Sequence, residues 1–348
     1  MHFKRSVRVV AMLLLFVLLC GCGNGNTPAG DSSVSRTVFA MDTVMELHPE
    51  GEHSKDACDR AERLILQLES ELSVTDSGSD VYAVNHADGA PVTVSDDTLE
   101  LLRAALDACA MTDGALDVSI YPVLCAWGFT TETYQVPDEN TVADLLEHVD
   151  YTRVGLNEEN DTVTLPKGME IDLGSVAKGY TADRVIDVFR DCGVNSGMIS
   201  LGGNVQVLGT KPDGSAWRIG VQDPKGEGFV GVISAVDQAV VTSGGYERFF
   251  EQDGVTYWHI LDPATGLPAR SGVVSSTVVG KSGVLCDALS TALFVMGPDR
   301  AAAFWKTHTG FDYLLVLDDG SLVLSEGLES VFEAAGDWAD AELEVIRR

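Results

Sequence analysis

The chain has 348 residues, enough for one large domain or two small ones. Apolar residues make up 45% and charged residues 22%, which is the composition of a chain that buries a core and excludes a disordered protein. Asp and Glu outnumber Lys and Arg by 53 to 23, so the net charge is −30. Such a protein repels nucleic acid, and we expect no nucleic-acid partner. It would bind a polyanionic small molecule only with the help of a metal ion or a local cluster of donors.

The first 35 residues have the pattern of a lipoprotein leader. Basic residues at positions 4, 5 and 8 precede the apolar run Val9–Leu19, which is shorter than a spanning helix of about 20 residues and is typical of a signal-peptide core. The following Leu-Cys-Gly-Cys, ending at Cys22, resembles the bacterial lipobox. By that resemblance residues 1–21 are a signal peptide and Cys22 carries the lipid at the extracytoplasmic face of the cell membrane. Residues 22–35 then form a flexible tether. The alternative is a plain secretory signal with a chance cysteine.

The next part of the chain alternates helical and strand patterns. Five cysteines lie beyond Cys22 without a CxxC pair, which argues against a zinc ribbon and leaves a single disulfide open. Ser95 stands just before an apolar helical pattern and is suited to cap it. Apolar spacing predicts, in order, a strand at Thr37–Leu47, helices at Asp56–Leu72, Asp97–Met111 and Thr141–His148, and two small strands within Arg153–Leu165.

A second half begins near Ile171. Helices are expected at Ser175–Phe189, Leu285–Met296 and Arg300–Thr307. Strands are expected at Ser196–Leu201, Val205–Leu208, Trp217–Val221, Gly228–Val236, Ala239–Thr242, Val273–Val279, Tyr313–Leu317 and Leu322–Leu324. This interleaving predicts a single α+β domain over residues 36–336, with a substantial antiparallel sheet and flanking helices. Residues 337–348 are acidic and are interpreted as a peripheral tail or helix.

Two groups of residues in the first half are candidates for ligand contact. Met41-Asp42-Thr43 follows a predicted strand, although a methionine there is more often part of the core. Asp113-Gly114-Ala115-Leu116-Asp117-Val118 follows a helix, and its small residues would let a ligand approach backbone donors. The alternative for the second group is a helix stop with a solvated carboxylate.

A third group runs from Ile171 to Tyr180. A glycine precedes the expected helix start, where free N–H groups and the helix dipole favour an anion, and Lys178 adds a cation. The alternative is an ordinary helix cap with a surface lysine. The pattern is neither the dinucleotide GxGxxG motif nor a P-loop.

The fourth group combines three segments, namely Thr242–Arg248, His259–Gly266 and Asp287–Thr291. Asp287 and Thr291 are four residues apart on a predicted helix, so their oxygens share a face. A carboxylate and a hydroxyl together suit a hard cation such as Mg²⁺, which takes further ligands from water and phosphate. Taken alone, such a pair is usually structural, and His259 is more often a hydrogen-bonded strand residue than a catalyst.

In their order along the chain these groups resemble the ApbE family of FAD:protein FMN transferases. The resemblance runs from about residue 37 to about residue 324 and departs from the common pattern at Asp42, where many relatives have glycine, and at Leu116, where an aromatic is common. It rests on a Met-x-Thr segment, GA-x-D, D-L-G-x-x-A-K-G-Y, S-L-G-G-N (Ser200–Asn204), T-S-G-x-Y-E-R, H-I-x-D-P-x-T-G-x-P and D-A-x-x-T-A-L.

The resemblance implies a role for each group. Mg²⁺ would bind Asp287, Thr291 and a backbone carbonyl near Ser175. His259 would sit beside the phosphates at the transfer site as the catalytic residue, with a nearby carboxylate as an alternative base. FAD would contact Met41, Ala115, Leu116, Asp117, Asp172, Lys178 and His259.

The implied reaction is Mg²⁺-dependent transfer of FMN from FAD to a Thr or Ser of another protein, with release of AMP. The expected acceptors are extracytoplasmic flavoproteins, such as subunits of redox complexes of the Rnf and Nqr kind. Three alternatives remain open. They are a hydrolase that converts FAD to FMN and AMP, a non-catalytic FAD-binding lipoprotein, and a solute-binding lipoprotein without a flavin role.

Overall fold

The computed structural model describes residues 33–131 and 133–348. The predicted signal peptide and Cys22 lie outside these residues. Within them the helices are α1 (Ser54–Leu72), α2 (Asp80–Asn85), α3 (Asp96–Met111), α4 (Tyr121–Trp127), α5 (Glu139–Leu146), α6 (Ala177–Asp191) and α7 (Gly283–Thr307).

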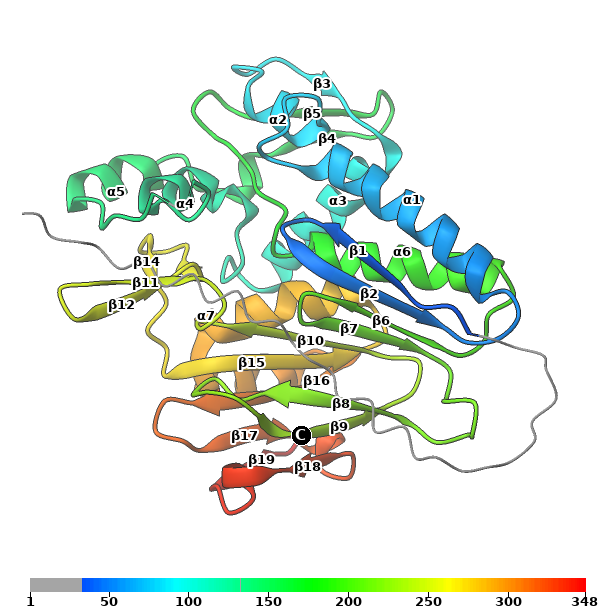
Figure 1. Cartoon of the computed structure of the whole chain (residues 1–348). Helices are drawn as coiled ribbons and strands as arrows, with labels where there is room; N and C mark the ends of the chain where they lie inside the picture. The colour runs from blue at the N-terminus through cyan, green and yellow to red at the C-terminus, as the bar shows by residue number, and fades with distance from the viewer. Residues whose placement is uncertain (1–32, 132) are drawn as a thin grey trace, which may run out of the picture. The chain divides into compact units, whose positions relative to one another are not determined.

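The strands of the same region form one large sheet and four small ones, and the chain is α+β as the sequence predicts (Figure 1). The large sheet holds β1 (Arg36–Ala40), β2 (Thr43–Pro49), β6 (Gly197–Leu201), β7 (Asn204–Leu208), β10 (Ala239–Gly244), β15 (Val273–Gly280), β16 (Phe311–Leu317), β17 (Leu322–Ser325) and β19 (Leu343–Ile346), in that order. The small sheets use β3 (Val92–Thr93), β4 (Gly155–Asn157), β5 (Thr162–Thr164), β8 (Trp217–Gln222), β9 (Phe229–Ala235), β11 (Phe249–Gln252), β12 (Val255–Trp258), β13 (Leu261–Asp262), β14 (Leu267–Pro268) and β18 (Phe332–Ala334).

The central strands of the large sheet are buried on both faces. On β16, Leu314 and Val316 pack with the small sheet β18-β9-β8, while Tyr313 and Leu315 pack with the helices. Alternate side chains of a strand point to opposite faces, so a strand covered on both sides needs apolar residues throughout. This explains the continuous apolar runs that the sequence shows at these strands.

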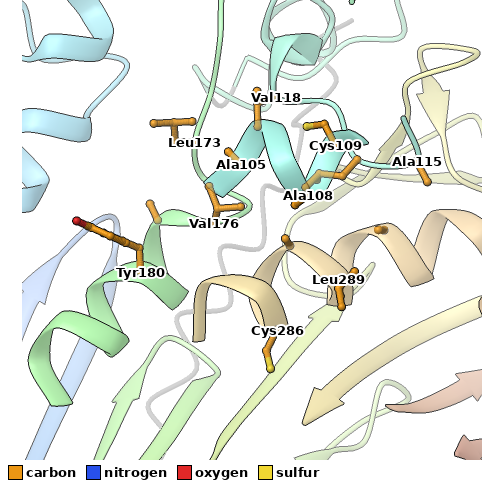
Figure 2. Close-up of a cluster of buried hydrophobic side chains, with 14 of the residues drawn as sticks. Ala105, Ala108, Cys109, Ala115, Val118, Leu173, Val176, Tyr180, Cys286 and Leu289 are labelled. Atoms are coloured by element: carbon orange, nitrogen blue, oxygen red, sulfur yellow. The ribbon is translucent and has the colours of Figure 1, made fainter. Parts of the chain in front are cut away.

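Helices α3, α6 and α7 meet over the other face of the sheet. Figure 2 shows small and branched side chains of the three elements converging there, among them Ala105, Val176 and Leu289. The closest approach is between Gly179 on α6 and Gly283 at the start of α7, where a methyl group on Gly179 would lie 2.2 Å from the Gly283 carbonyl oxygen. Glycine at both positions therefore allows the two backbones to touch.

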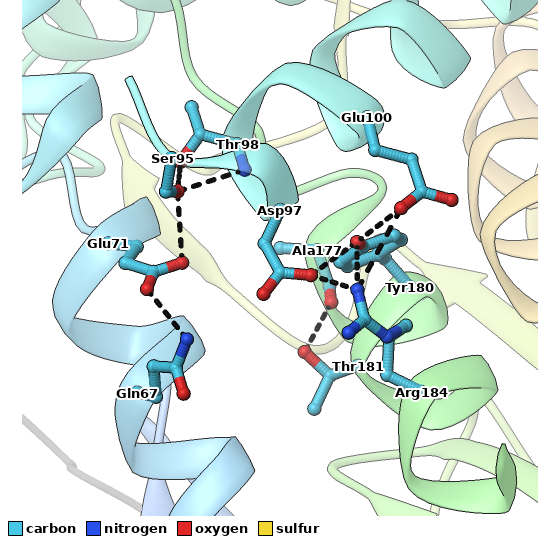
Figure 3. Close-up of polar contacts among 10 residues, drawn as sticks. All are labelled: Gln67, Glu71, Ser95, Asp97, Thr98, Glu100, Ala177, Tyr180, Thr181 and Arg184. Atoms are coloured by element: carbon cyan, nitrogen blue, oxygen red, sulfur yellow. Dashed lines mark hydrogen bonds and ion pairs between the residues drawn. The ribbon is translucent and has the colours of Figure 1, made fainter. Parts of the chain in front are cut away.

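A polar network holds α3 against α6 (Figure 3). The Tyr180 hydroxyl lies 2.7 Å from Asp97 Oδ1 and 3.1 Å from Glu100 Oε2. Arg184 forms an ion pair with the same Asp97 oxygen. Since the side chain of Asp97 is largely buried, the guanidinium compensates a charge that would otherwise be costly to bury.

The first turn of α7 is fixed by a carboxylate from α6. Asp183 accepts hydrogen bonds from the backbone N–H groups of Gly283 at 2.8 Å and Val284 at 3.0 Å. Gln206 on β7 donates to the same carboxylate at 2.8 Å. A carboxylate at a helix N-terminus satisfies free donors and opposes the positive end of the dipole. The Asp183 carboxylate thus connects α6 to the first turn of α7 and to β7 of the large sheet.

The structure differs from the sequence-based expectation at both ends of the domain. The strand expected at Thr37–Leu47 is a hairpin, because Met41 and Asp42 adopt positive φ of 50° and 57° and reverse the chain between β1 and β2. The acidic segment after residue 336 is not a separate tail, and after a short 3-10 turn at Gly336–Trp338 it forms a strand. Its β19 pairs in parallel with β17, and Trp338 is buried.

Two further observations concern the described residues only. None of their helices has the length and apolar character needed to cross a bilayer. All five of their cysteines are free thiols.

Replacement of Gly179 by alanine tests the contact between α6 and α7. Alanine favours helix by about 1 kcal/mol over glycine, but overpacking costs about 1–3 kcal/mol, and here the obstacle is backbone. We expect Gly179→Ala to lower the free energy of unfolding by about 1–2 kcal/mol in urea titrations. Gly226→Ala is the control, because no atom lies within 4 Å of the added methyl group. Equal stability of both variants would contradict a tight helix contact.

Candidate functional site

The centre of the candidate site is the carboxylate of Asp287 on α7. Asp287 is 3% exposed, and its Oδ2 accepts a hydrogen bond of 2.8 Å from the backbone N–H of Gly179 in the first turn of α6. Ser175 lies four residues before Gly179, just ahead of the helix start. The contact between the two helices therefore brings Asp287 beside the first turn of α6.

The charge of Asp287 is only partly compensated by protein groups. Burial raises the pKa of the Asp287 carboxyl, while Lys178, the Asn204 amide and the Gly179 N–H lower it. The Asn204 side chain faces the carboxylate, yet its Nδ2 has no hydrogen-bond partner within the described structure. A buried carboxylate with so few donors gains from a cation placed against it.

Hydroxyl groups extend this position along α7. Ser243 Oγ on β10 lies 2.7 Å from Ser290 Oγ and 3.2 Å from Thr291 Oγ1. The structure thus joins the T-S-G motif to the predicted metal-binding Thr291. No three His, Cys, Asp or Glu side chains converge as a metal cluster in residues 33–131 and 133–348. A bound cation would accordingly need hydroxyl, backbone or substrate oxygens beside Asp287, a donor set that fits Mg²⁺.

Asp172 and Lys178 flank the start of α6, as the third sequence group predicts. Asp172 Oδ1 accepts a hydrogen bond of 2.9 Å from the Gly174 N–H, which shapes the turn before the helix. Burial raises the pKa of the Asp172 carboxyl, whereas Arg248 and Lys178 lower it. Both cations are therefore close to this carboxylate.

Glu247 is a further acid of the site, and its residue is exposed to solvent. Desolvation by the surrounding protein nevertheless raises the pKa of its carboxyl from 4.5 to about 7, Lys178 and Arg248 lower it, and Asp287 raises it. Its Oε1 faces Gly203 in the turn between β6 and β7. Near neutral pH this carboxyl exists in both protonation states.

His259 follows β12 and is half-buried. Its backbone N–H and its Nδ1 lie 3.1 Å and 3.2 Å from the carbonyl oxygen of Arg248. If Nδ1 donates to this carbonyl, Nε2 keeps a free lone pair. Burial and then the charge of Arg248 lower the pKa of the imidazole to about 4, so the ring is neutral at pH 7.

Met41 lies at the tip of the β1–β2 hairpin, where it meets α6. Its N–H donates to Glu69 at 2.7 Å, and the Thr181 hydroxyl lies 3.7 Å from its Sδ. The adjacent Thr43 packs against Gly202 in the β6–β7 turn. This turn also contains Gly203, which faces Glu247, so the hairpin tip borders the site.

The Ala115–Asp117 segment has a structural function that the sequence does not reveal. Ala115 and Leu116 are buried in the core between the helices. Asp117 is 7% exposed, and its carboxylate accepts hydrogen bonds from Ser119 and from the Tyr151 N–H. The side chains of this segment are thus committed to the protein, and a ligand would meet its backbone.

Comparison with known proteins identifies the chain. The ApbE family profile matches residues 41–315. FAD:protein FMN transferase of Treponema pallidum is 32% identical over 90% of this chain and 93% of its own length, and that of Klebsiella pneumoniae is 36% identical over 84% and 91%. The crystal structure of the ApbE protein from Thermotoga maritima superposes with a TM-score of 0.82 at 34% identity, covering 86% of this chain and 99% of that one.

The chain belongs to the ApbE family. Its Glu247 and Arg248 lie inside the T-S-G-x-Y-E-R motif, but sequence reasoning gave them no role, because neighbouring charges from α6 and α7 are invisible in the sequence. Sequence reasoning attached Trp127 and Phe129 to the Asp113–Val118 group, but it missed that they form an aromatic cluster next to His259. The other members of this cluster are Tyr134, Phe250 and Tyr257. In sequence its members fall into segments more than a hundred residues apart.

The raised pKa of Glu247 predicts a pH dependence of stability for this ApbE-family protein. The folded-state pKa of about 7 exceeds the ordinary value of 4.5. The protonated Glu247 carboxyl therefore leaves the free energy of unfolding at its full value below pH 4.5, and that free energy falls as the pH rises to about 7. Glu247→Gln should remove this loss. In urea unfolding without metal, the variant should therefore gain stability relative to wild type between pH 4.5 and pH 7.

Glu251→Gln on the exposed hairpin is the control and should follow the wild-type pH profile. Parallel profiles of wild type and Glu247→Gln would show that Glu247 is not desolvated.

Proposed function

We propose that this protein is a Mg²⁺-dependent FAD:protein FMN transferase that esterifies a Thr or Ser hydroxyl of an extracytoplasmic flavoprotein and releases AMP. The observation that carries the proposal is the ApbE-family match over residues 41–315, together with the convergence of its motif residues around Asp287. The relatives from Treponema pallidum and Klebsiella pneumoniae bear the name of this activity.

Asp287 and Thr291 are the side chains that would hold the metal, with a backbone carbonyl near Ser175 as a third ligand. The buried, partly compensated carboxylate and the adjoining hydroxyls supply the hard oxygen donors that Mg²⁺ prefers. When bound, the cation would neutralise charge on the pyrophosphate oxygens. It would also allow a chain of net charge −30 to accept a polyanionic substrate.

Lys178 and Arg248 are suited to hold the pyrophosphate. Both cations act on Asp172 and Glu247, and neither forms an ion pair with a carboxylate in the described residues. Cations next to the start of α6 that are not paired with a carboxylate favour a phosphate. Their positive charge offsets that of the surrounding carboxylates at the position proposed for the pyrophosphate.

His259 is suited to take the proton of the acceptor hydroxyl. In the transfer, the acceptor oxygen forms a bond to the FMN phosphorus, the bond from that phosphorus to the AMP oxygen breaks, and the hydroxyl proton passes to Nε2. The Arg248 carbonyl fixes the ring through Nδ1, and the neutral imidazole is ready to accept a proton at pH 7. Proton transfer of this kind is worth about 10²–10⁴-fold in rate.

The proposal includes attachment to the membrane through lipid on Cys22. The lipobox after a short apolar core supports it, and residues 22–35 would tether the domain near redox complexes of the Rnf and Nqr kind, which are the proposed acceptors. A Cys22→Ser protein should appear in the soluble fraction of cell extracts. Complete retention of that variant in membranes would contradict lipid anchoring.

The function is tested by intact-mass spectrometry of an acceptor after incubation with this protein, FAD and Mg²⁺. We expect the acceptor to gain one FMN moiety, and excess chelator or Asp287→Ala to abolish the gain. Free FMN and AMP without any acceptor modification would indicate a hydrolase. Unchanged FAD would indicate a flavin-binding or solute-binding protein.

His259→Ala tests the assignment of the base. We expect the single-turnover rate of FMN transfer to fall by about 10²-fold or more, because proton removal is lost, while FAD affinity and melting temperature change little. His308→Ala is a matched control, since the His308 ring also contacts a backbone carbonyl, at 2.9 Å from Phe304, but lies at the far end of α7. A destabilised His259→Ala protein with full activity would contradict the assignment of His259 as the base.

A further inference from the structure

The hairpin β11–β12 has one face fixed to the body of the protein. Trp258 points to that side, where its ring meets Phe294 of α7 at a centroid distance of 6.1 Å and Arg270 stacks over it at 4.0 Å. Successive residues of a strand point to opposite faces. Tyr257 and Val255 lie one and three residues before Trp258 on β12. Their side chains therefore point away from α7.

His259 continues the same row. Its N–H bonds to the Arg248 carbonyl and extends the ladder in which Phe249 pairs with Trp258. His259 thus stands two residues beyond Tyr257 and four beyond Val255 on the outward face. The ring of Phe129, 6.3 Å from the imidazole and 5.8 Å from Phe250, confirms that the histidine and this face adjoin.

The outward face is an apolar strip that starts at His259 and ends in solvent. Next to the histidine, Phe129 and Trp127 cover the rings of Phe250 and Tyr257. Farther out, Tyr134 stacks on Phe250 at 5.3 Å and is 39% exposed, and Val255 near the hairpin tip is 43% exposed. Exposed apolar side chains at the edge of an aromatic cluster, rather than scattered singly, are typical of a binding surface.

We propose that this strip, formed by Tyr134, Phe250, Val255 and Tyr257, is the docking surface for the acceptor protein. The proposal rests on the proposed function, because transfer to a protein hydroxyl requires a polypeptide seated within bonding distance of the FMN phosphorus and next to the base. The exposed members of the strip are Tyr134 and Val255, while Phe250 and Tyr257 are half-buried against Trp127 and Phe129 and lead from the exposed members to His259. It fits an acceptor segment with apolar side chains flanking the target Thr or Ser.

The strip also explains how an acidic enzyme selects a protein partner. With a net charge of −30, long-range attraction would favour only basic partners, whereas desolvation of aromatic side chains is insensitive to charge. Tyr and Trp are enriched among the few residues that carry most of the binding energy at protein interfaces. An acceptor held by these rings would have its hydroxyl positioned at Nε2 without contributing to FAD binding.

The test is the acceptor dependence of transfer by Tyr134→Ala, Val255→Ser and the double variant, made in the full chain. Both residues are exposed, so the substitutions should leave folding intact. The probe is the extracytoplasmic domain of an Rnf-type flavoprotein subunit, or of an Nqr-type subunit if the wild type modifies that one. With FAD and Mg²⁺ saturating, we expect the double variant to raise KM for the acceptor about tenfold or more. We expect kcat and FAD affinity to be unchanged.

Phe229→Ser is the matched control, because Phe229 is 49% exposed on β9, in the small sheet on the opposite face from α7. It should leave KM unchanged. A double variant with weaker FAD binding and unaltered acceptor KM would assign the strip to the flavin ring instead, and unaltered values of both would refute the docking surface. Absence of transfer by the wild type would refute the proposed function itself, whereas transfer with unchanged KM would refute only the strip.

Discussion

The carboxylate of Asp287, buried where α6 and α7 touch, is the constraint around which the site is arranged. Gly179 and Gly283 allow the helix backbones to meet, and only at that distance can the Gly179 N–H reach the Asp287 oxygen. Asp183 then fixes the first turn of α7 through two backbone N–H groups. Packing of small residues therefore determines where a costly charge is placed, and that charge determines what the site can bind.

The electrostatics of the site link substrate binding to base strength. Burial, and then the charges of Arg248 and Lys178, lower the pKa of His259 to about 4 in the free protein. A pyrophosphate beside these cations would offset their charge and raise the proton affinity of the imidazole. The base would thus become stronger once the phosphates are in place. Glu247, half-ionised near pH 7 and facing the same cations, would respond to the substrate in the same direction.

Much of the fold follows from the sequence because its strands and helices carry strong patterns. Helix α1, expected at Asp56–Leu72, is found at Ser54–Leu72, and Ser95 caps α3 through the Thr98 N–H. The two helices expected at Leu285–Met296 and Arg300–Thr307 make up α7, which has a non-helical break between them at Gly297, whose φ is 76°. Helical patterns of this length are recognisable from the local sequence alone, so the predicted and observed helices agree closely.

The errors lie where local patterns are short or tertiary pairing decides. The turn at Met41–Asp42 has positive φ at two residues other than glycine, and the sequence pattern gives no indication of this turn. A glycine at position 42, which the family resemblance gives as the common residue, would adopt this positive φ without strain. The last strand, β19, is defined by its pairing with β17 and not by its acidic sequence.

The candidate site shows the same division. Asp287 and Thr291 could be proposed from their spacing on one helix, and α7 presents Asp287 to Gly179 of α6 and Thr291 to Ser243 of β10. Glu247, Arg248 and the aromatic rings beside His259 could not, because their significance arises from contacts between segments remote in sequence. Asp117 illustrates the opposite case, in which a motif carboxylate is engaged by Ser119 and by the Tyr151 N–H.

The most direct measurement of the central claim is the melting temperature of wild type and Asp287→Asn at pH 8, each with and without Mg²⁺ and FAD. Asparagine keeps the shape and an acceptor for the Gly179 N–H but removes the buried charge. The variant without metal should be at least as stable as wild type, because burial raises the pKa of this carboxyl and its charge is a cost. Mg²⁺ with FAD should raise the melting temperature of wild type by several degrees and leave that of the variant nearly unchanged. A strongly destabilised variant, together with a wild type that does not respond to Mg²⁺, would contradict the claim that Asp287 is held in the core to bind a cation.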